Sequence, residues 1–200
     1  MTETRTFDIL NVVSQPDALL AVTENPRHRA ILLNFRRHAL LEVSGLWEQI
    51  LVPEMTVAEP VYRINEMGTS VRLEGRDEVA AFYQGITDAG LNVFGPIEES
   101  MAVADWGLAI ESLFGNYVPG HVLREQGEDI DDPDAWYQLT HYFASFWPYN
   151  EDCLLMGEHI YEDIGSRSVR KLDAEEVVTP SQARALLAPL LASPPPLVVA

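Results

Sequence analysis

The chain has 200 residues, of which 47% are hydrophobic and 22% are charged. This length and composition suit one folded domain with extensions and exclude a disordered chain. The formal net charge of −18, from 31 acidic and 13 basic residues, opposes binding to nucleic acid or to an anionic membrane, because both need a basic surface.

Cysteine content and the amino terminus add two further limits. Cys153 is the only cysteine, so an internal disulfide and a cysteine-based zinc cluster are both excluded. The first residues lack a basic segment followed by an apolar one, which is the pattern of a secretory signal. No apolar run approaches the roughly 18 residues that cross a bilayer. We therefore expect a cytoplasmic protein.

A long amphipathic helix is predicted after Asn25. Asn25-Pro26 combines an N-cap side chain with proline at the first helical position. Apolar residues then recur at steps of three and four, which indicates one buried face of a helix that ends before Pro53. The residues of this face are Ile31, Leu32, Phe35, Ala39, Val43, Leu46, Trp47 and Ile50. Residues 1–25 are predicted to form an arm that contains a short helix.

The stretch Thr56–Tyr62 follows this helix and holds one carboxylate, Glu59, among apolar side chains. Pro60 has no N–H, so a strand here must be short, bulged or at a sheet edge. Glu59 is then either a solvated loop residue or a base at the entrance of a pocket, and the residues leave both interpretations open. A loop over residues 65–72 is predicted next.

A second helix is predicted from Gly75 to Gly90, with Val79, Phe82, Tyr83 and Ile86 on its buried side. Four strand-like runs follow, at about residues 91–104, 108–118, 135–147 and 154–163, separated by turn signals. A short helix over residues 181–191 is predicted to dock on the same chain or on a partner subunit. The order indicates an α+β fold, with helices on one face of a curved antiparallel sheet.

Polar residues inside the apolar strands are the candidates for chemistry. Strand alternation places Glu158 on one face with Leu154, Met156 and Ile160. If this face is the core, the carboxyl group must be paired or its pKa raised, as a general acid or base requires. If it faces solvent or a partner subunit, Glu158 has no such role, and both interpretations stay open.

Two histidines lie in the last two predicted strands. His141 sits among aromatic residues and is the only side chain of its strand that titrates near neutral pH, so it is the best proton carrier there. His159 lies on the opposite face from Glu158, where a lone histidine is more often structural. The aromatic residues around His141 can equally be core.

Other kinds of chemistry receive little support. The motifs G-x-G-x-x-G, G-x-S-x-G, H-E-x-x-H and the P-loop do not occur. His121, His141 and His159 with Glu158 form one conceivable set of metal ligands, but no metal-binding spacing supports it. The sequence therefore predicts no metal and no other cofactor.

The chain resembles the nuclear transport factor 2-like superfamily, which includes SnoaL-like polyketide cyclases, ketosteroid isomerases and limonene epoxide hydrolases. The resemblance covers about residues 27–165. It depends on the helix order and on three motifs, which are Thr56-Val57-Ala58-Glu59-Pro60-Val61, the helix Gly75…Val79-Ala80-Ala81-Phe82-Tyr83, and Gly157-Glu158-His159-Ile160-Tyr161-Glu162-Asp163. It implies a cone-shaped α+β domain over residues 26–165, preceded by the arm and followed by a tail over residues 166–200.

The resemblance also implies roles for particular residues. Glu59 stands where ketosteroid isomerases have their catalytic aspartate, whereas Phe35 replaces the tyrosine that stabilises the enolate. The second donor of those enzymes falls near His141 or Tyr142. The Asp-Arg-Asp arrangement of limonene-type epoxide hydrolases is not evident.

The predicted function is therefore binding of a small hydrophobic molecule of the polyketide, steroid or terpenoid kind by a homodimeric protein. The predicted chemistry is cofactor-free isomerisation, cyclisation, dehydration or epoxide opening. Glu59 or Glu158 would act as the base and His141 as the acid. The residues expected to contact substrate are Phe35, His38, Tyr62, Tyr83, Tyr142 and His159. The alternative is a non-catalytic module for ligand binding or dimer assembly.

Overall fold

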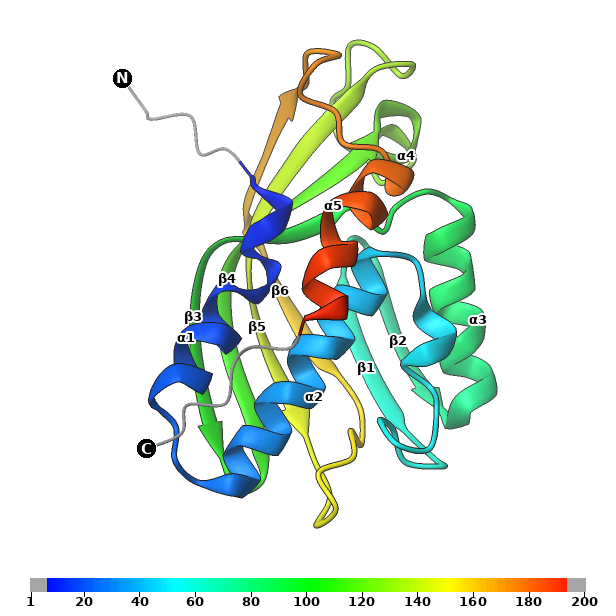
Figure 1. The fold of residues 1–200 in the computed structure, drawn as a ribbon. Coiled ribbons are helices and arrows are strands. Elements are labelled where there is room, and N and C mark those ends of the chain that lie inside the picture. The colour runs from blue at the N-terminus through cyan, green and yellow to red at the C-terminus, as the bar shows by residue number, and fades with distance from the viewer. Residues whose placement is uncertain (1–6, 194–200) are drawn as a thin grey trace.

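The structure, a computed structural model, describes residues 7–193 of the chain. Six strands form one curved sheet in the order β2-β1-β6-β5-β4-β3 (Figure 1). Neighbouring strands are antiparallel except β1 and β6, which run parallel. The strands are β1 (Val61–Glu66), β2 (Thr69–Glu74), β3 (Phe94–Ala104), β4 (Gly107–Pro119), β5 (Trp136–Pro148) and β6 (His159–Lys171). The predicted α+β class with a curved sheet is confirmed.

Among the described residues, five α-helices accompany the sheet, and α1, α2 and α5 cross the same face of it (Figure 1). They are α1 (Ser14–Val22), α2 (Pro26–Val43), α3 (Gly75–Asp88), α4 (Gly120–Glu125) and α5 (Pro180–Ala192). The start of α2 is as predicted, because Asn25 Oδ1 accepts hydrogen bonds from the backbone N–H groups of Arg27 and His28. Helix α2 ends at Val43, and a separate 3₁₀ turn over Trp47–Gln49 completes the predicted apolar face.

The predicted loop over residues 65–72 is wrong, because this segment is a hairpin of β1 and β2. Met67 and Gly68 both have positive φ, at 53° and 75°, which is the geometry of a tight two-residue hairpin turn. The usual Asn-Gly or Asp-Gly signal is missing, so the sequence pattern does not reveal this turn.

The last strand also begins and ends later than predicted. β6 starts at His159 rather than at residue 154, and it continues to Lys171. The earlier residues still pair with the segment before β1, since Val57 and Val61 donate backbone hydrogen bonds to Leu155 and Met156. The predicted domain boundary at residue 165 therefore falls inside a strand. The first six residues of the predicted arm and the last seven of the tail lie outside the described residues.

Helix α2 is buried on two sides. Its residues Ile31, Leu32 and Phe35 pack against the sheet. On its other side Leu40 and Val43 join a second hydrophobic cluster. This cluster includes Leu187 of α5 and Val12 of the 3₁₀ helix Ile9–Val13. Helix α5 therefore docks on its own chain, where Arg184 also donates to the carbonyl groups of Ser44 and Gly45. This packing holds both apolar faces of α2 in place.

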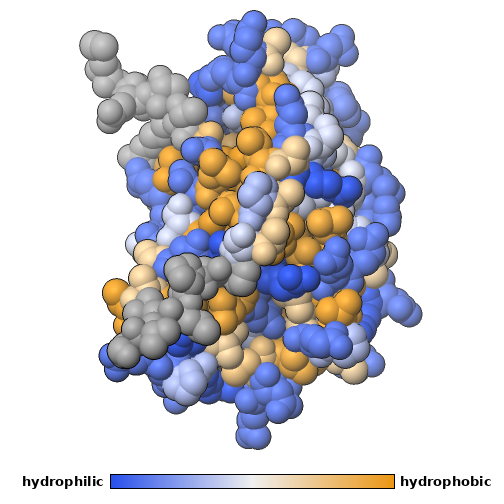
Figure 2. All heavy atoms as spheres, viewed as in Figure 1, coloured by the Kyte–Doolittle hydropathy of each residue, from blue (hydrophilic) through white to orange (hydrophobic). Residues whose placement is uncertain are grey.

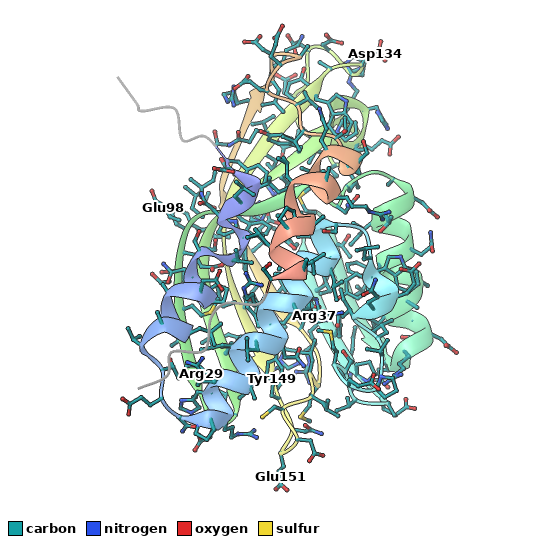
Figure 3. All side chains as sticks on the ribbon, viewed as in Figure 1. Arg29, Arg37, Glu98, Asp134, Tyr149 and Glu151 are labelled. Carbon is teal, nitrogen blue, oxygen red and sulfur yellow. The ribbon has the colours of Figure 1, made fainter. Side chains whose placement is uncertain are left out.

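Charge lies mainly at the surface. The labelled side chains of Glu98, Asp134 and Glu151 point outward at the sheet edge and at the two ends of the molecule (Figure 3). Figure 2 shows that hydrophobic atoms gather around α5 on the helical face, between hydrophilic atoms on both sides. No helix among residues 7–193 has the length and apolar character to cross a membrane.

Candidate functional site

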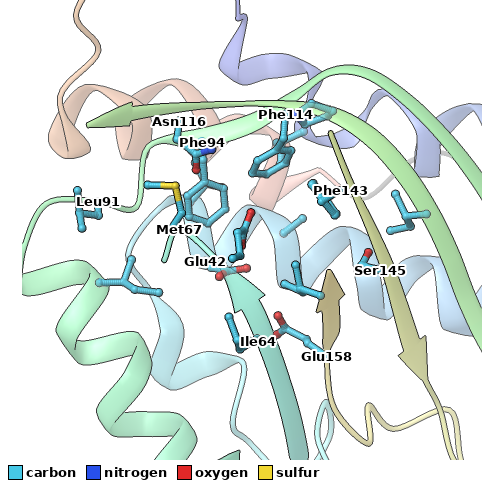
Figure 4. A pocket seen from close by; sticks show the side chains of 18 of the residues that line it. Glu42, Ile64, Met67, Leu91, Phe94, Phe114, Asn116, Phe143, Ser145 and Glu158 are labelled. Atoms are coloured by element: carbon cyan, nitrogen blue, oxygen red, sulfur yellow. The ribbon is translucent and has the colours of Figure 1, made fainter. Parts of the chain in front are cut away.

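A cavity of about 230 Å³ lies between the helices and the sheet. Its wall is mainly apolar and rich in aromatic rings, with a few polar groups, as is typical of a small-molecule binding site. The rings belong to Phe35, Phe82, Phe94, Phe114, Phe143 and Trp147. Figure 4 shows Glu42 and Glu158 projecting into this cavity below the rings of Phe94 and Phe114.

Glu42 and Glu158 meet at His38, which has no exposed surface. Nε2 of His38 lies 3.1 Å from Oε1 of Glu158 and 3.4 Å from Oε2 of Glu42. His38 and Glu42 are one helical turn apart on α2, so they share a face of the helix. Glu158 reaches them from the segment immediately before β6. One imidazole is thus held between two carboxyl groups at the wall of the cavity.

Two tyrosines extend this cluster into the core. The hydroxyl group of Tyr83 donates a short hydrogen bond to Oε1 of Glu158. The hydroxyl group of Tyr62 lies 3.1 Å from that of Tyr83. Since the Tyr83 proton is directed to Glu158, Tyr62 donates to the Tyr83 oxygen. Both tyrosines are at most 1% exposed, so these hydrogen bonds form in a dry environment where they are strong.

The ionisation of this cluster follows from burial and charge together. Burial alone would lower the pKa of His38, but the charges and hydrogen bonds of Glu158 and Glu42 raise it to about 9. Burial raises the pKa of Glu42 to about 7, against the opposing effect of His38. Nδ1 of His38 has no hydrogen-bond partner among the described residues, which costs free energy when the ring is charged. The pKa of Glu42 therefore lies near neutral pH.

Glycine before Glu158 allows the close crossing that places this carboxylate. A Cβ atom on Gly157 would lie 1.8 Å from the carbonyl oxygen of Val61, so no other residue fits without moving β1. The backbone N–H of Arg63 then donates to the carbonyl group of Glu158 at 2.7 Å. These contacts fix the direction of the Glu158 side chain.

Among the described residues, His38, Glu42 and Glu158 form the one set of side chains spaced closely enough to hold a metal ion. One ligand atom from each of His38, Glu42 and Glu158 lies within 4.8 Å of the other two. The contacts between these atoms are already hydrogen bonds within the protein, which explains their short spacing without an ion.

The structure brings together five of the residues predicted from the sequence. Phe35 and Glu158 line the cavity, and His38, Tyr83 and Tyr62 form the polar network behind Glu158. His38 is at the centre of this network.

His141 lies beside the cavity, and the side chain of Glu66 separates the two. Its Nε2 is 2.9 Å from Oε1 of Glu66, and Glu66 itself lines the cavity. His141 is fully buried, and its Nδ1 lies 3.8 Å from Glu162, which is paired with Arg167.

Three other predicted residues lie outside the cavity. Glu59 is exposed and rests against Gly75 at the start of α3. Tyr142 is 40% exposed on the opposite face of the sheet. His159 is partly exposed and lies 3.0 Å from Arg63. Partial burial, followed by the charge of Arg63, lowers its pKa. The interpretation of Glu59 as a solvated loop residue therefore agrees with the structure.

Three carboxyl groups of the cavity wall are absent from the sequence-based candidates. Glu42 had a detectable signal, because it follows His38 by four residues beside the buried Val43. Glu66 and Glu99 had none, since their positions depend on the unrecognised hairpin and on a bulge between Pro96 and Glu98. The bulge shifts the alternation of β3, so that Glu99 faces inward.

Comparison with known proteins shows the fold. No protein-family model matches the chain, and no curated protein matches it in sequence. Among solved structures, one described as a SnoaL-like polyketide cyclase from Jannaschia sp. CCS1 is similar, with a TM-score of 0.51 and 12% identity. The match covers 71% of this chain and 91% of that one.

A second similar structure is Bal32a from a soil-derived mobile gene cassette, with a TM-score of 0.47 and 9% identity. This match covers 69% of this chain and 92% of that one. The first of these two matches shows that the chain has the SnoaL-like fold, as its motifs suggest. At these identities the likeness concerns the fold alone, and the site must be interpreted from its own residues.

Proposed function

We propose that the protein binds a small hydrophobic molecule in the cavity and catalyses a cofactor-free proton transfer on it. The observation that carries this proposal is the His38–Glu42–Glu158 cluster at the wall of an otherwise apolar cavity. Reactions of this kind include isomerisation, cyclisation, dehydration and epoxide opening. Polyketide, steroid or terpenoid-like molecules are the substrate classes that the SnoaL-like fold suggests.

Glu42 is the proposed base. Its carboxyl group lines the cavity, and its pKa of about 7 lies near the working pH, where a general base is most effective. The imidazolium of His38 stabilises the carboxylate form of Glu42, which is the form that accepts a proton from the substrate. Glu158 fixes His38 and is fixed in turn by Tyr83.

This proposal revises the roles predicted from the sequence. Glu158 becomes a positioning residue that also borders the cavity, in place of the predicted base. His141 is not proposed as the acid, because it does not line the cavity and its side chain contacts Glu66 instead. Glu59 is left outside because its carboxylate is exposed to solvent.

A bicyclic ketone provides a test that needs no knowledge of the natural substrate. The α-protons of 2-tetralone exchange with D₂O when a base removes them, and NMR measures the exchange rate. We expect the full chain to accelerate exchange above the buffer rate. Glu42→Gln should lower this acceleration by about 10²–10⁴-fold, the usual contribution of a general base. Glu59→Gln is the matched control and should leave the rate unchanged.

Two results would contradict the proposal. Equal exchange by the wild type and by Glu42→Gln would remove Glu42 as the base. Binding of the ketone without any acceleration would favour the alternative, a non-catalytic ligand-binding module.

We also propose that the protein forms a homodimer through the outer face of the sheet. Four aromatic residues on this face are 40–48% exposed, and an exposed apolar patch often marks an interface. We call them the outer aromatic patch, and they are Trp106, Tyr142, Phe146 and Tyr161. The ring of Phe146 lies 6.3 Å from Trp106 and 6.5 Å from Tyr161, so these three form one surface. The cytoplasmic location stays a prediction.

A further inference from the structure

All ionisable side chains that the described residues place in the cavity wall are acids. They are Glu42, Glu66, Glu99 and Glu158. Lysine, arginine and histidine do not occur among the described residues that line the cavity. In a low-dielectric space, four carboxyl groups disfavour an anionic ligand strongly, because Coulomb repulsion is poorly screened there.

Three of these acids already have partners. Glu42 and Glu158 are paired with His38, and Glu66 is paired with His141. Glu99 differs, because its Oε1 atom is buried and forms no hydrogen bond with any described residue. Burial alone raises the pKa of Glu99 to about 7, with no contribution from a neighbouring cation.

A second polar group on the same wall of the cavity is also unsatisfied. Asn116 on β4 lines the cavity and is 7% exposed, and its Nδ2 atom forms no hydrogen bond with a described residue. Buried polar groups without partners are uncommon in folded proteins and cost stability. Two such groups on the β3–β4 wall of one cavity leave hydrogen-bonding capacity that a bound ligand can satisfy.

We propose that Glu99 binds a positively charged amino group of the ligand, so that the cavity takes an apolar molecule bearing a basic amine. An ammonium group can donate to the unpaired Glu99 oxygen, and this charge-assisted hydrogen bond is strong away from water. Asn116 would donate to an acceptor group on the same ligand. The apolar body of the ligand would lie against Phe94 and Phe114. This inference rests on the proposed function for the cavity itself and adds the chemical class of its ligand.

Three probes with one ring system separate the possibilities. They are 2-naphthylmethylamine, 2-naphthylmethanol and 2-naphthoate, titrated calorimetrically into the full chain at about pH 8. We expect the amine to bind at least about tenfold more tightly than the alcohol, which is a modest gain for a charge-assisted hydrogen bond. The carboxylate should show no measurable binding.

Two variants assign the effect to Glu99. Glu99→Gln should bring the affinity for the amine to within about twofold of that for the alcohol, and it should leave the affinity for the alcohol unchanged. Glu111→Gln removes an exposed carboxylate from the other face of β4 and should preserve the preference of the wild type for the amine.

The outcomes distinguish this inference from the proposal on which it rests. If the alcohol and the amine bind equally, or if Glu99→Gln keeps the preference, Glu99 is not the amine site, although the cavity still binds apolar ligands. Tighter binding of the carboxylate would also overturn the inference. If none of the probes binds, the function proposed for the cavity fails together with the inference.

Discussion

Buried ionisable groups at this site differ in how their charge is compensated. His38 is flanked by two carboxyl groups, and Glu158 receives hydrogen bonds from His38 and Tyr83. Glu99 has no comparable partner among the described residues. A carboxylate that stays unpaired in the free protein lowers its stability, and such a residue persists where function needs it. The loss of folding stability that the unpaired carboxylate of Glu99 causes should therefore be measurable.

The stability of the protein should depend on pH through Glu99. Its pKa rises from an ordinary value near 4.5 to about 7 on folding, so the folded state holds the proton more tightly than the unfolded state. Its contribution to stability is complete below about pH 4.5 and is lost as the pH rises through 7. Glu42 acts in the same direction.

Glu99→Gln should therefore raise the melting temperature by a few degrees at about pH 8 and have little effect at about pH 4, where Glu99 is protonated in both states. A gain of 1 kcal/mol corresponds to about 2–4 °C for a chain of this size. Scanning calorimetry of both proteins at the two pH values measures this difference. A melting temperature that the substitution changes equally at both values would show that ionisation of Glu99 is not the cause. Glu111→Gln serves as the control for a lost surface charge.

At the scale of elements, the site depends on one close crossing between two segments. The segment before β6 passes so near to β1 that Gly157 has no room for a side chain. This crossing places Glu158 against α2, which brings His38 and Glu42 from the other side. The position of the site is thus set by the contact between β1 and residues 155–158 as much as by the helix.

Two glycine substitutions test this crossing. Gly157→Ala should destabilise the protein by more than about 3 kcal/mol, because either β1 or residues 155–158 must move. Gly85→Ala is the matched control, since a Cβ atom there meets nothing within 4 Å in the middle of α3. It should stabilise the protein by about 0.5–1 kcal/mol. Urea unfolding measures the free energy of unfolding of both variants. If Gly157→Ala unfolds with the same free energy as Gly85→Ala, the crossing tolerates a side chain.

At the scale of the whole molecule, the sheet separates two surfaces with different roles. Odd-numbered residues of β5, such as Phe143 and Ser145, line the cavity, whereas Tyr142 and Phe146 face outward. The aromatic character of both faces of β5 is therefore explained by a cavity on one side and the outer aromatic patch on the other. A homodimer would bury this patch and leave the cavity unchanged.

The oligomeric state can be tested by introducing an aspartate on the outer aromatic patch and, as a control, on the helical face. Phe146→Asp should convert a dimer into a monomer in sedimentation velocity experiments, because a buried, unpaired carboxylate opposes association. Val22→Asp places the same charge at the end of α1, on the face of the sheet that the helices cover, at a position that is 77% exposed, and should leave the dimer intact. A wild-type chain that sediments as a monomer at high concentration would refute the dimer.

The sequence by itself determined the elements that carry local signals. Asn25-Pro26 and Gly75 mark helix starts, and both helices begin there in the structure. The curved α+β sheet also followed from the order of elements and the family motifs. The β1–β2 hairpin was missed, because Met67 stands where Asn or Asp usually precedes glycine in such a turn, although Gly68 suits its positive φ.

The site was decided by tertiary structure. His38 and Glu42 share a helix face, so their proximity is implied by spacing along the chain. Their meeting with Glu158, more than 100 residues later, depends on how β1 and the segment before β6 pack together. Glu59 matched a family motif but lies in solvent, and Glu99 turned inward because of a bulge. Motifs and periodicity describe neighbours along the chain, whereas burial, charge pairing and pKa depend on neighbours in space.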